Sequence, residues 1–146
     1  MPENLFESVP VNKLYKESAV RIATFLGGPL VAGYLIAENY KSLGQPAKAK
    51  TTWIYTIVLT IVIFGAIMFI PEVAKVPNYI IPIIFAGIAS LLVQRLQGTD
   101  IKLHTEKGGQ FYTIWRALLA SLIGFVVTFG ILILVVVITD TGDLFK

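Results

Sequence analysis

The fold class follows from residues 117–139, which read ALLASLIGFVVTFGILILVVVIT. These 23 residues contain no charged side chain. A helix rises 1.5 Å per residue and the hydrocarbon core of a bilayer is about 30 Å thick, so about 20 apolar residues cross it. The stretch therefore predicts a membrane-spanning helix over residues 117–138.

Three more uncharged windows precede this one, and the four together cover 79 of the 146 residues: Ile22–Ala37, Thr51–Pro71, Val76–Gln94 and Ala117–Thr139. Charged residues make up 14% of the chain, against about 25% in an average soluble domain. A soluble core of this size cannot hide so much uncharged sequence, which excludes a soluble globular enzyme. We expect an all-α integral membrane bundle that forms one membrane domain over residues 1–146.

The two middle windows predict further transmembrane helices over residues 51–70 and 79–96. Each is long enough to cross the hydrocarbon core. Gly98 follows the second of them and is expected to end that helix, because glycine is common just after a helix C-terminus.

The N-terminal window is shorter and is interrupted by Gly27, Gly28 and Pro29. Its 16 residues give about 24 Å, which is less than the hydrocarbon core. Glycine suits a left-handed helix end and proline suits the first position of a new helix. We therefore expect a broken helix over residues 22–43, after a polar, amphipathic segment over residues 1–20.

Charge distribution favours one of two topologies for this broken helix. If it spans the membrane, the two sides carry seven and five Lys and Arg residues. If it is re-entrant or interfacial, one side carries ten and the other only Lys75 and Lys146. Basic residues gather on the cytoplasmic side. The split favours three spans with a cytoplasmic N-terminus and an outside C-terminus, and a fourth span stays open as the alternative.

Composition also limits the chemistry of the chain. It has no cysteine and one histidine, which excludes disulfides, thiolate sites and a multi-histidine metal site. His104 and Glu106 form an H-x-E pair that we interpret as part of a solvated loop. No catalytic residue, metal site or cofactor is predicted. The net charge of +3 reflects basic loops of a membrane protein rather than nucleic-acid binding.

The polar residues beside the broken helix form one candidate site, made of Arg21, Glu38 and Asn39. Glu38 is either a proton-carrying carboxylate at a membrane mouth or part of a solvated helix end. Arg21 and Glu38 flank the same apolar window, so they can pair only if the window folds back on itself.

Two further sets of residues are typical of membrane helices. Small residues four positions apart allow close helix packing, within the chain or with a partner: Ala86 with Ser90, and Ala120 with Gly124. Aromatic residues near the ends of the predicted spans are expected to anchor them at the membrane interfaces: Trp53, Tyr55, Tyr79 and Trp115.

Several motifs occur in the order TFLGGPL at residues 24–30, then Tyr34, NYKSLG at residues 39–44, and PNYIIP at residues 77–82. In this order they resemble a group of small uncharacterised bacterial multi-span membrane proteins, which have GGPL, N-[YF]-x-x-L-G and P-N-x-x-x-P motifs. The resemblance covers roughly residues 20 to 100. It implies a bacterial inner membrane and transfers no catalytic residue.

The three long uncharged windows contain no Asp, Glu, Lys, Arg or His, whereas proton pumps, ion-coupled carriers and voltage sensors place such groups within the membrane. We therefore expect an accessory or scaffold protein that contacts the lipid bilayer and packs against other membrane proteins or itself. A small oligomeric transporter or channel that uses the Gly-Gly-Pro break is the alternative. An enzyme at the lipid surface, using Glu38, His104 or Glu106, is the third hypothesis.

Overall fold

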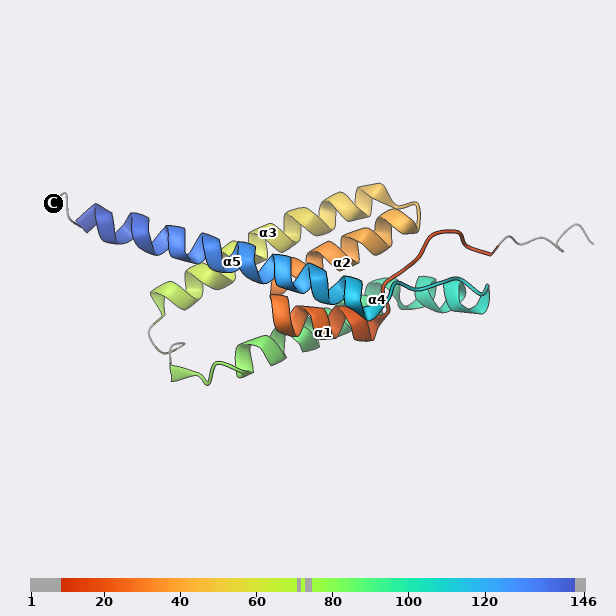
Figure 1. Ribbon diagram of the computed structural model, residues 1–146, viewed down its shortest axis with the longest axis horizontal. Helices are drawn as coiled ribbons and strands as arrows, with labels where there is room; N and C mark the ends of the chain where they lie inside the picture. Colours follow the sequence, from red (N-terminus) through yellow and green to blue (C-terminus); the bar gives the residue numbers. More distant parts are fainter. Residues whose placement is uncertain (1–8, 71, 73–74, 144–146) are drawn as a thin grey trace, which may run out of the picture.

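The structure is a computed structural model that describes residues 9–70, 72 and 75–143, with backbone only for 140–143. Figure 1 shows its five helices in order along the chain. Their bounds are α1 Glu17–Gly27, α2 Pro29–Ser42, α3 Pro46–Phe69, α4 Ile80–Glu106 and α5 Ile114–Asp143. The described part of the chain contains no strand beyond a single isolated bridge between Leu14 and Phe111.

The two short helices form a hairpin, residues 17–42, in which α2 folds back along α1. Gly28 separates them with φ +79°, a conformation that favours glycine, and its N–H donates to the Thr24 carbonyl at 2.8 Å. Pro29 then occupies the first position of α2, where a missing N–H costs no helical hydrogen bond. Helices of 11 and 14 residues are about 16 and 21 Å long, too short to cross a bilayer core.

The other three helices are long and apolar enough to cross a membrane. They are Pro46–Phe69, Ile80–Glu106 and the stretch Ile114–Thr139 of α5. The expected end of the second span was wrong, because α4 continues through Gly98 and ends only at Glu106. Space around Gly98 is open, and most of the residues that follow are polar, so the helix continues beyond the apolar window.

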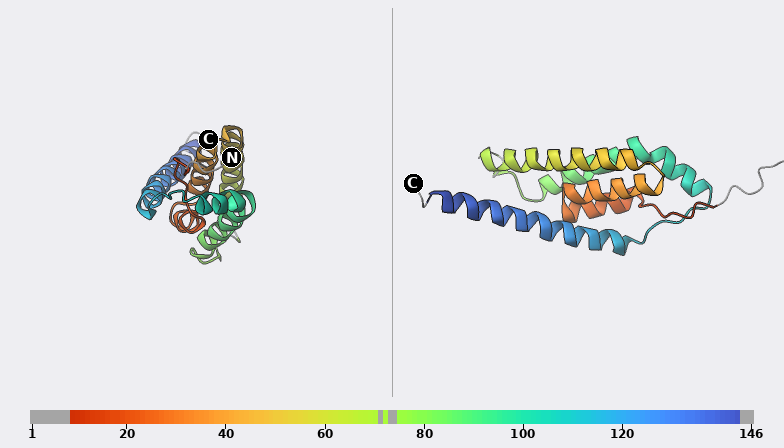
Figure 2. Two further views of the ribbon diagram at one scale, coloured as in Figure 1. Left: turned by 90° about the vertical axis from the view of Figure 1, so that its right-hand side faces the viewer. Right: turned by 90° about the horizontal axis from the view of Figure 1, so that it is seen from above.

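The hairpin lies at the centre of the molecule and each long helix packs on it. Helix α3 contacts α2, whereas α4 and α5 contact both arms of the hairpin. Within the described residues no Cα atoms of two different long helices lie within 8 Å of each other. Two further views show the three long helices around the short orange hairpin (Figure 2). The long helices are therefore held together through the hairpin.

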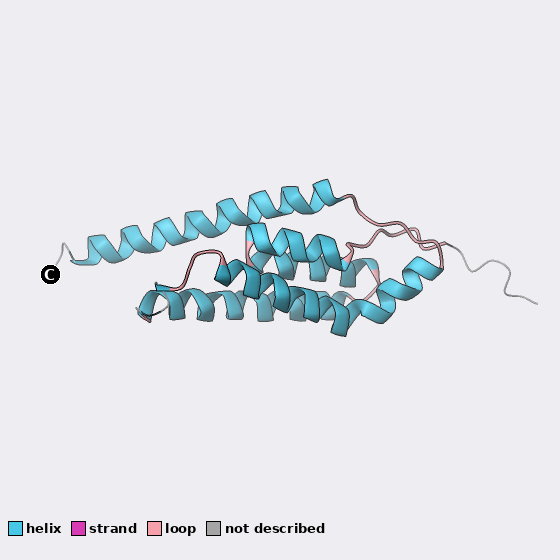
Figure 3. Cartoon of the chain, turned by 90° about the horizontal axis from the view of Figure 1, so that it is seen from below, coloured by secondary structure: helices cyan, strands magenta, loops and turns pink. Residues whose placement is uncertain are grey.

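Both ends of the hairpin lie at the end of the molecule where α3 and α5 begin and α4 finishes, which we call the basic end (Figure 3). Segments 9–16 and 107–113 run side by side there. The Leu14 N–H donates to the Gln110 carbonyl at 3.3 Å, and the Tyr112 N–H donates to the Leu14 carbonyl at 2.9 Å. The opposite end, where α3 finishes and α4 begins, is called the distal end.

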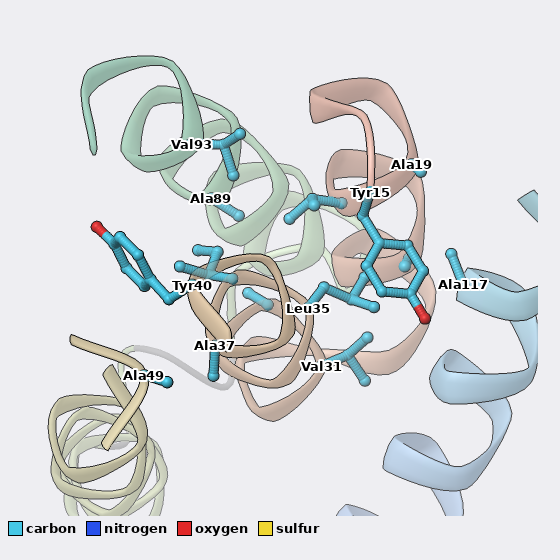
Figure 4. Packing of buried hydrophobic residues seen from close by; sticks show 14 residues of the cluster. Tyr15, Ala19, Val31, Leu35, Ala37, Tyr40, Ala49, Ala89, Val93 and Ala117 are labelled. Carbon is cyan, nitrogen blue, oxygen red and sulfur yellow. The ribbon is translucent and has the colours of Figure 1, made fainter. Parts of the chain in front are cut away.

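The buried apolar residues gather around the hairpin rather than between the long helices (Figure 4). Leu35 on α2 and Val20 on α1 are fully buried, and Val93 of α4 and Ala117 of α5 close the cluster from two sides. Beyond the hairpin tip, the long helices expose their aliphatic side chains. The core therefore fills the basic half of the molecule and leaves the distal half without one.

Candidate functional site

Asn39 is a fully buried polar residue of the hairpin and joins three parts of the chain. Its Oδ1 accepts the Tyr15 N–H at 2.7 Å, and its Nδ2 donates to the Tyr15 carbonyl at 3.0 Å. The same Nδ2 also donates to Oε1 of Gln97 on α4 at 3.1 Å. Gln97 in turn donates from Nε2 to the Ile36 carbonyl at 2.8 Å. We call the side chains of Asn39 and Gln97, with the Tyr15 backbone that they hold, the clasp, because these groups join the segment before α1, helix α2 and helix α4.

The amide groups of the clasp are hydrogen-bonded within the chain, so the clasp offers no group for catalysis or ligand binding. Asn39 and Gln97 are fully buried, and their amide groups bond to backbone or to each other. A buried amide without partners destabilises a fold, whereas a fully bonded network specifies one arrangement. The arrangement therefore fixes the hairpin in place, and we interpret it as structural.

The expected polar site of Arg21, Glu38 and Asn39 does not form as one cluster. The segment does fold back, yet Arg21 pairs with Glu17 at 3.6 Å and Glu38 pairs with Lys41 at 2.7 Å. Both are pairs within one helix, at spacings of four and three residues, which is the geometry that helix surfaces favour. The fold-back that would allow an Arg21–Glu38 pair is therefore present, but among the described residues each side chain pairs within its own helix.

Glu17 also reaches across to α4. Its Oε1 accepts the hydroxyl of Ser90, and Nε2 of Gln94 lies 3.4 Å from the same hydroxyl oxygen. An acidic residue in the first turn of α1 is thus joined to the middle of α4. Ser90 and Ala86, which the small-residue spacing singles out, are both buried within the chain on this side of α4.

The second pair of small residues, Ala120 and Gly124, faces the hairpin. A Cβ on Gly124 would overlap the Val31 side chain of α2. One on Gly27, at the hairpin tip, would lie 2.8 Å from the backbone of Ser121. Ser121 donates its hydroxyl to the Ala23 carbonyl of α1 at 3.0 Å. The small residues of α5 therefore allow its backbone to approach the tip of the hairpin.

The parallel packing of α1 and α5 brings together two short segments that each have alanine and glycine four positions apart. Residues 23–27 read ATFLG and residues 120–124 read ASLIG, 97 positions later. Tyr15 and Tyr112 have the same separation, and their rings lie 4.6 Å apart. Two short segments with alanine and glycine at matching positions thus pack side by side.

The four expected interface anchors divide into two kinds. Tyr55, Tyr79 and Trp115 are 65%, 63% and 73% exposed, which suits residues that meet lipid headgroups. Trp53 is partly buried and faces Tyr34, with ring centroids 6.4 Å apart. It therefore contributes to packing between α2 and α3.

His104 and Glu106 lie in the last turn of α4 and not in the loop where they were expected. Nε2 of the buried His104 lies 2.8 Å from the Gln110 carbonyl, so this nitrogen carries a proton and donates it. Glu106 pairs with Lys102 at 4.0 Å. In the part of the chain that the structure describes, no group of three or more His, Cys, Asp or Glu residues is placed to hold a metal ion.

Two apolar grooves lie between α3 and α5, where these helices stay apart. The first, which we call the Arg116 groove, has a volume of about 480 Å³ and is lined by Leu30, Val31, Tyr34, Trp53, Arg116, Leu119, Ala120, Ile123, Gly124 and Val127. The second, the distal groove, has a volume of about 460 Å³ and is lined by Leu30, Ile57, Thr60, Ile61, Phe64, Gly65, Met68, Thr128, Ile131, Leu132 and Val135. Sequence patterns gave no sign of either, because each needs the hairpin to hold the two helices apart.

Comparisons of the chain with protein-family models, with curated proteins and with solved structures gave no match. The interpretation of the candidate sites therefore rests on their geometry alone.

Proposed function

We propose that the chain is an accessory or scaffold protein of the membrane, which packs against an apolar transmembrane helix of another membrane protein. The observation that carries the proposal is the distal half of the bundle. There α3 and α5 stay apart, their aliphatic side chains are exposed, and the distal groove lies open between them. In a bundle that is complete as a monomer, the long helices would instead pack against one another in this half.

The distal groove has features that suit a helix rather than a small polar ligand. Gly65 has open space around its Cα, so another backbone has room to approach it closely. Thr128 also lines the groove, but its hydroxyl is buried within the chain and is not open to a partner. A partner helix with small residues would therefore pack on Gly65.

The alternative, a transporter or channel that uses the helix break, would need the break to line a path. Gly27 instead packs on the backbone of Ser121, and the break closes against α5. The uncharged windows of the three long helices also supply no ionisable group for coupled transport. Both observations favour the accessory function.

The topology that goes with this function has the hairpin re-entering from the cytoplasmic side of a bacterial inner membrane. Ten basic residues belong to the basic end or the adjoining helix turns: Lys13, Lys16, Arg21, Lys41, Lys48, Lys50, Arg95, Lys102, Lys107 and Arg116. Lys75 belongs to the connection at the distal end. The positive-inside rule supports this orientation, and the motif resemblance supports the bacterial setting.

The test uses two glycines whose surroundings are open, so that added bulk does not strain the monomer. Gly65→Leu fills the distal groove, whereas Gly130→Leu adds the same bulk to α5 outside the groove. After crosslinking in the native membrane, a specific partner should be retained by the Gly130→Leu variant and lost from Gly65→Leu. Equal recovery of every crosslinked protein by the two variants would contradict the proposal.

A further inference from the structure

The Arg116 groove has one charged end and an otherwise apolar length. Arg116 is the only charged residue that lines it, and Tyr34 and Trp53 line it as aromatic residues with polar atoms. The other lining residues carry aliphatic side chains or, in Gly124, none. This order of polarity, cationic at one end and apolar beyond, matches an amphiphile with an anionic head.

The groove also has the direction that a lipid needs. Arg116 lies in the first turn of α5, at the basic end, and Val127 lies eleven residues further into the apolar stretch. Eleven residues of helix measure about 16 Å, roughly half of a hydrocarbon core. Leu30 lines both the Arg116 groove and the distal groove, so a chain that runs past Val127 meets further apolar wall.

Arg116 itself is placed to receive an anion. Its guanidinium lies over the ring of Tyr112, with 4.2 Å to the ring centroid, and it forms no ion pair with an acidic residue in the described chain. Stacking on a ring fixes the plane of the guanidinium and leaves N–H groups at its edge. These donors suit the oxygens of a phosphate, which arginine binds with two parallel hydrogen bonds.

We propose that the Arg116 groove binds an anionic phospholipid, with its phosphate on Arg116 and one acyl chain along the α5 face from Leu119 to Val127. A transmembrane helix is the other candidate occupant, but an apolar helix would leave the Arg116 guanidinium without an anion. The lipid would complete the wall between α2, α3 and α5 at the point where protein contacts are missing. The site is separate from the partner surface proposed above, since Gly65 and Thr128 do not line it.

The test measures how phospholipids raise the melting temperature of delipidated, detergent-solubilised protein. Phosphatidylglycerol should stabilise the protein at a concentration about tenfold lower than phosphatidylcholine does. Both lipids carry a phosphate, but the choline ammonium of phosphatidylcholine cancels the net negative charge that Arg116 attracts. Arg116→Gln should remove this preference, and Arg116→Lys should keep part of it. Arg95→Gln, an arginine outside the groove with no ion pair in the described chain, should leave the preference intact.

A second pair of variants tests the apolar part without touching the charge. Ile123→Trp narrows the groove, whereas Leu122→Trp adds the same bulk to the neighbouring exposed position outside it. The first should abolish stabilisation by phosphatidylglycerol and the second should not. Equal stabilisation by both lipids, an unchanged preference in Arg116→Gln, or no difference between the tryptophan variants would overturn the proposal. Stabilisation by inorganic phosphate alone, at the same concentration, would show an anion site without a lipid site and would also overturn it.

Discussion

Asn39 on α2 bonds to both backbone polar groups of Tyr15, the N–H at 2.7 Å and the carbonyl at 3.0 Å. Tyr15 precedes α1 and Asn39 lies near the end of α2, 24 positions later. One side chain thus closes the loop that α1 and α2 make, and through Gln97 it attaches that loop to α4.

Replacing Asn39 should therefore loosen the whole hairpin. Asn39→Ala leaves the Tyr15 backbone groups and the Gln97 amide buried with fewer partners, at a cost of about 1–3 kcal/mol for each unsatisfied group. Asn12→Ala is the matched control, because Asn12 makes a single exposed hydrogen bond to the Ser42 carbonyl. In detergent, the melting temperature should fall by a large amount for Asn39→Ala and hardly at all for Asn12→Ala. Similar melting temperatures would show that the clasp does not hold the hairpin.

Gly124 should behave as an internal packing residue. Gly124→Leu drives a side chain into Val31 and should destabilise the purified monomer by about 1–3 kcal/mol. Gly130→Leu, on the same helix but in open space, should leave monomer stability nearly unchanged. Differential scanning fluorimetry of the two monomers compares them directly. A stable Gly124→Leu monomer would mean that α5 does not pack on the hairpin tip.

The turn at Gly28 should resist any Cβ. Its φ of +79° is costly for other residues, so Gly28→Ala should lose about 1 kcal/mol of stability. Gly87→Ala should be neutral or stabilising, because Gly87 lies inside α4 with open space around it. Gly33 is unsuitable as a control, since a Cβ there would overlap Thr56. Chemical unfolding of the wild type, Gly28→Ala and Gly87→Ala compares their free energies of unfolding. A Gly28→Ala variant as stable as the wild type would argue for one continuous helix.

Local sequence features predict much of this fold. The uncharged stretch at 117–139 and its two shorter counterparts mark the apolar parts of the long helices, because hydrophobicity along one helix is a local property. The Gly-Gly-Pro run likewise marks a helix end at Gly28, where the structure has one. The predicted helix end at Gly98 is wrong because a glycine ends a helix only where the chain must turn, and α4 has room to continue.

The parts that sequence reasoning missed depend on contacts between distant positions. Gln97 and Asn39 are 58 residues apart, and no pattern within either segment shows that they meet. The spacing of Ala120 and Gly124 correctly marks a close approach but does not say which helix approaches. Both grooves exist only because the hairpin separates α3 from α5, which is a property of the assembled bundle.

The re-entrant hairpin is the central claim, and single-cysteine labelling tests it most directly because the chain has no cysteine of its own. Cysteines placed singly at the exposed positions Val11, Lys48 and Lys75 are treated in intact cells with a membrane-impermeant maleimide. The hairpin places Val11 and Lys48 on the same side of the membrane, so only the Lys75→Cys variant should react until the cells are broken. Reaction of Val11→Cys together with Lys75→Cys, while Lys48→Cys stays protected, would show that residues 17–42 span the membrane and would contradict the account.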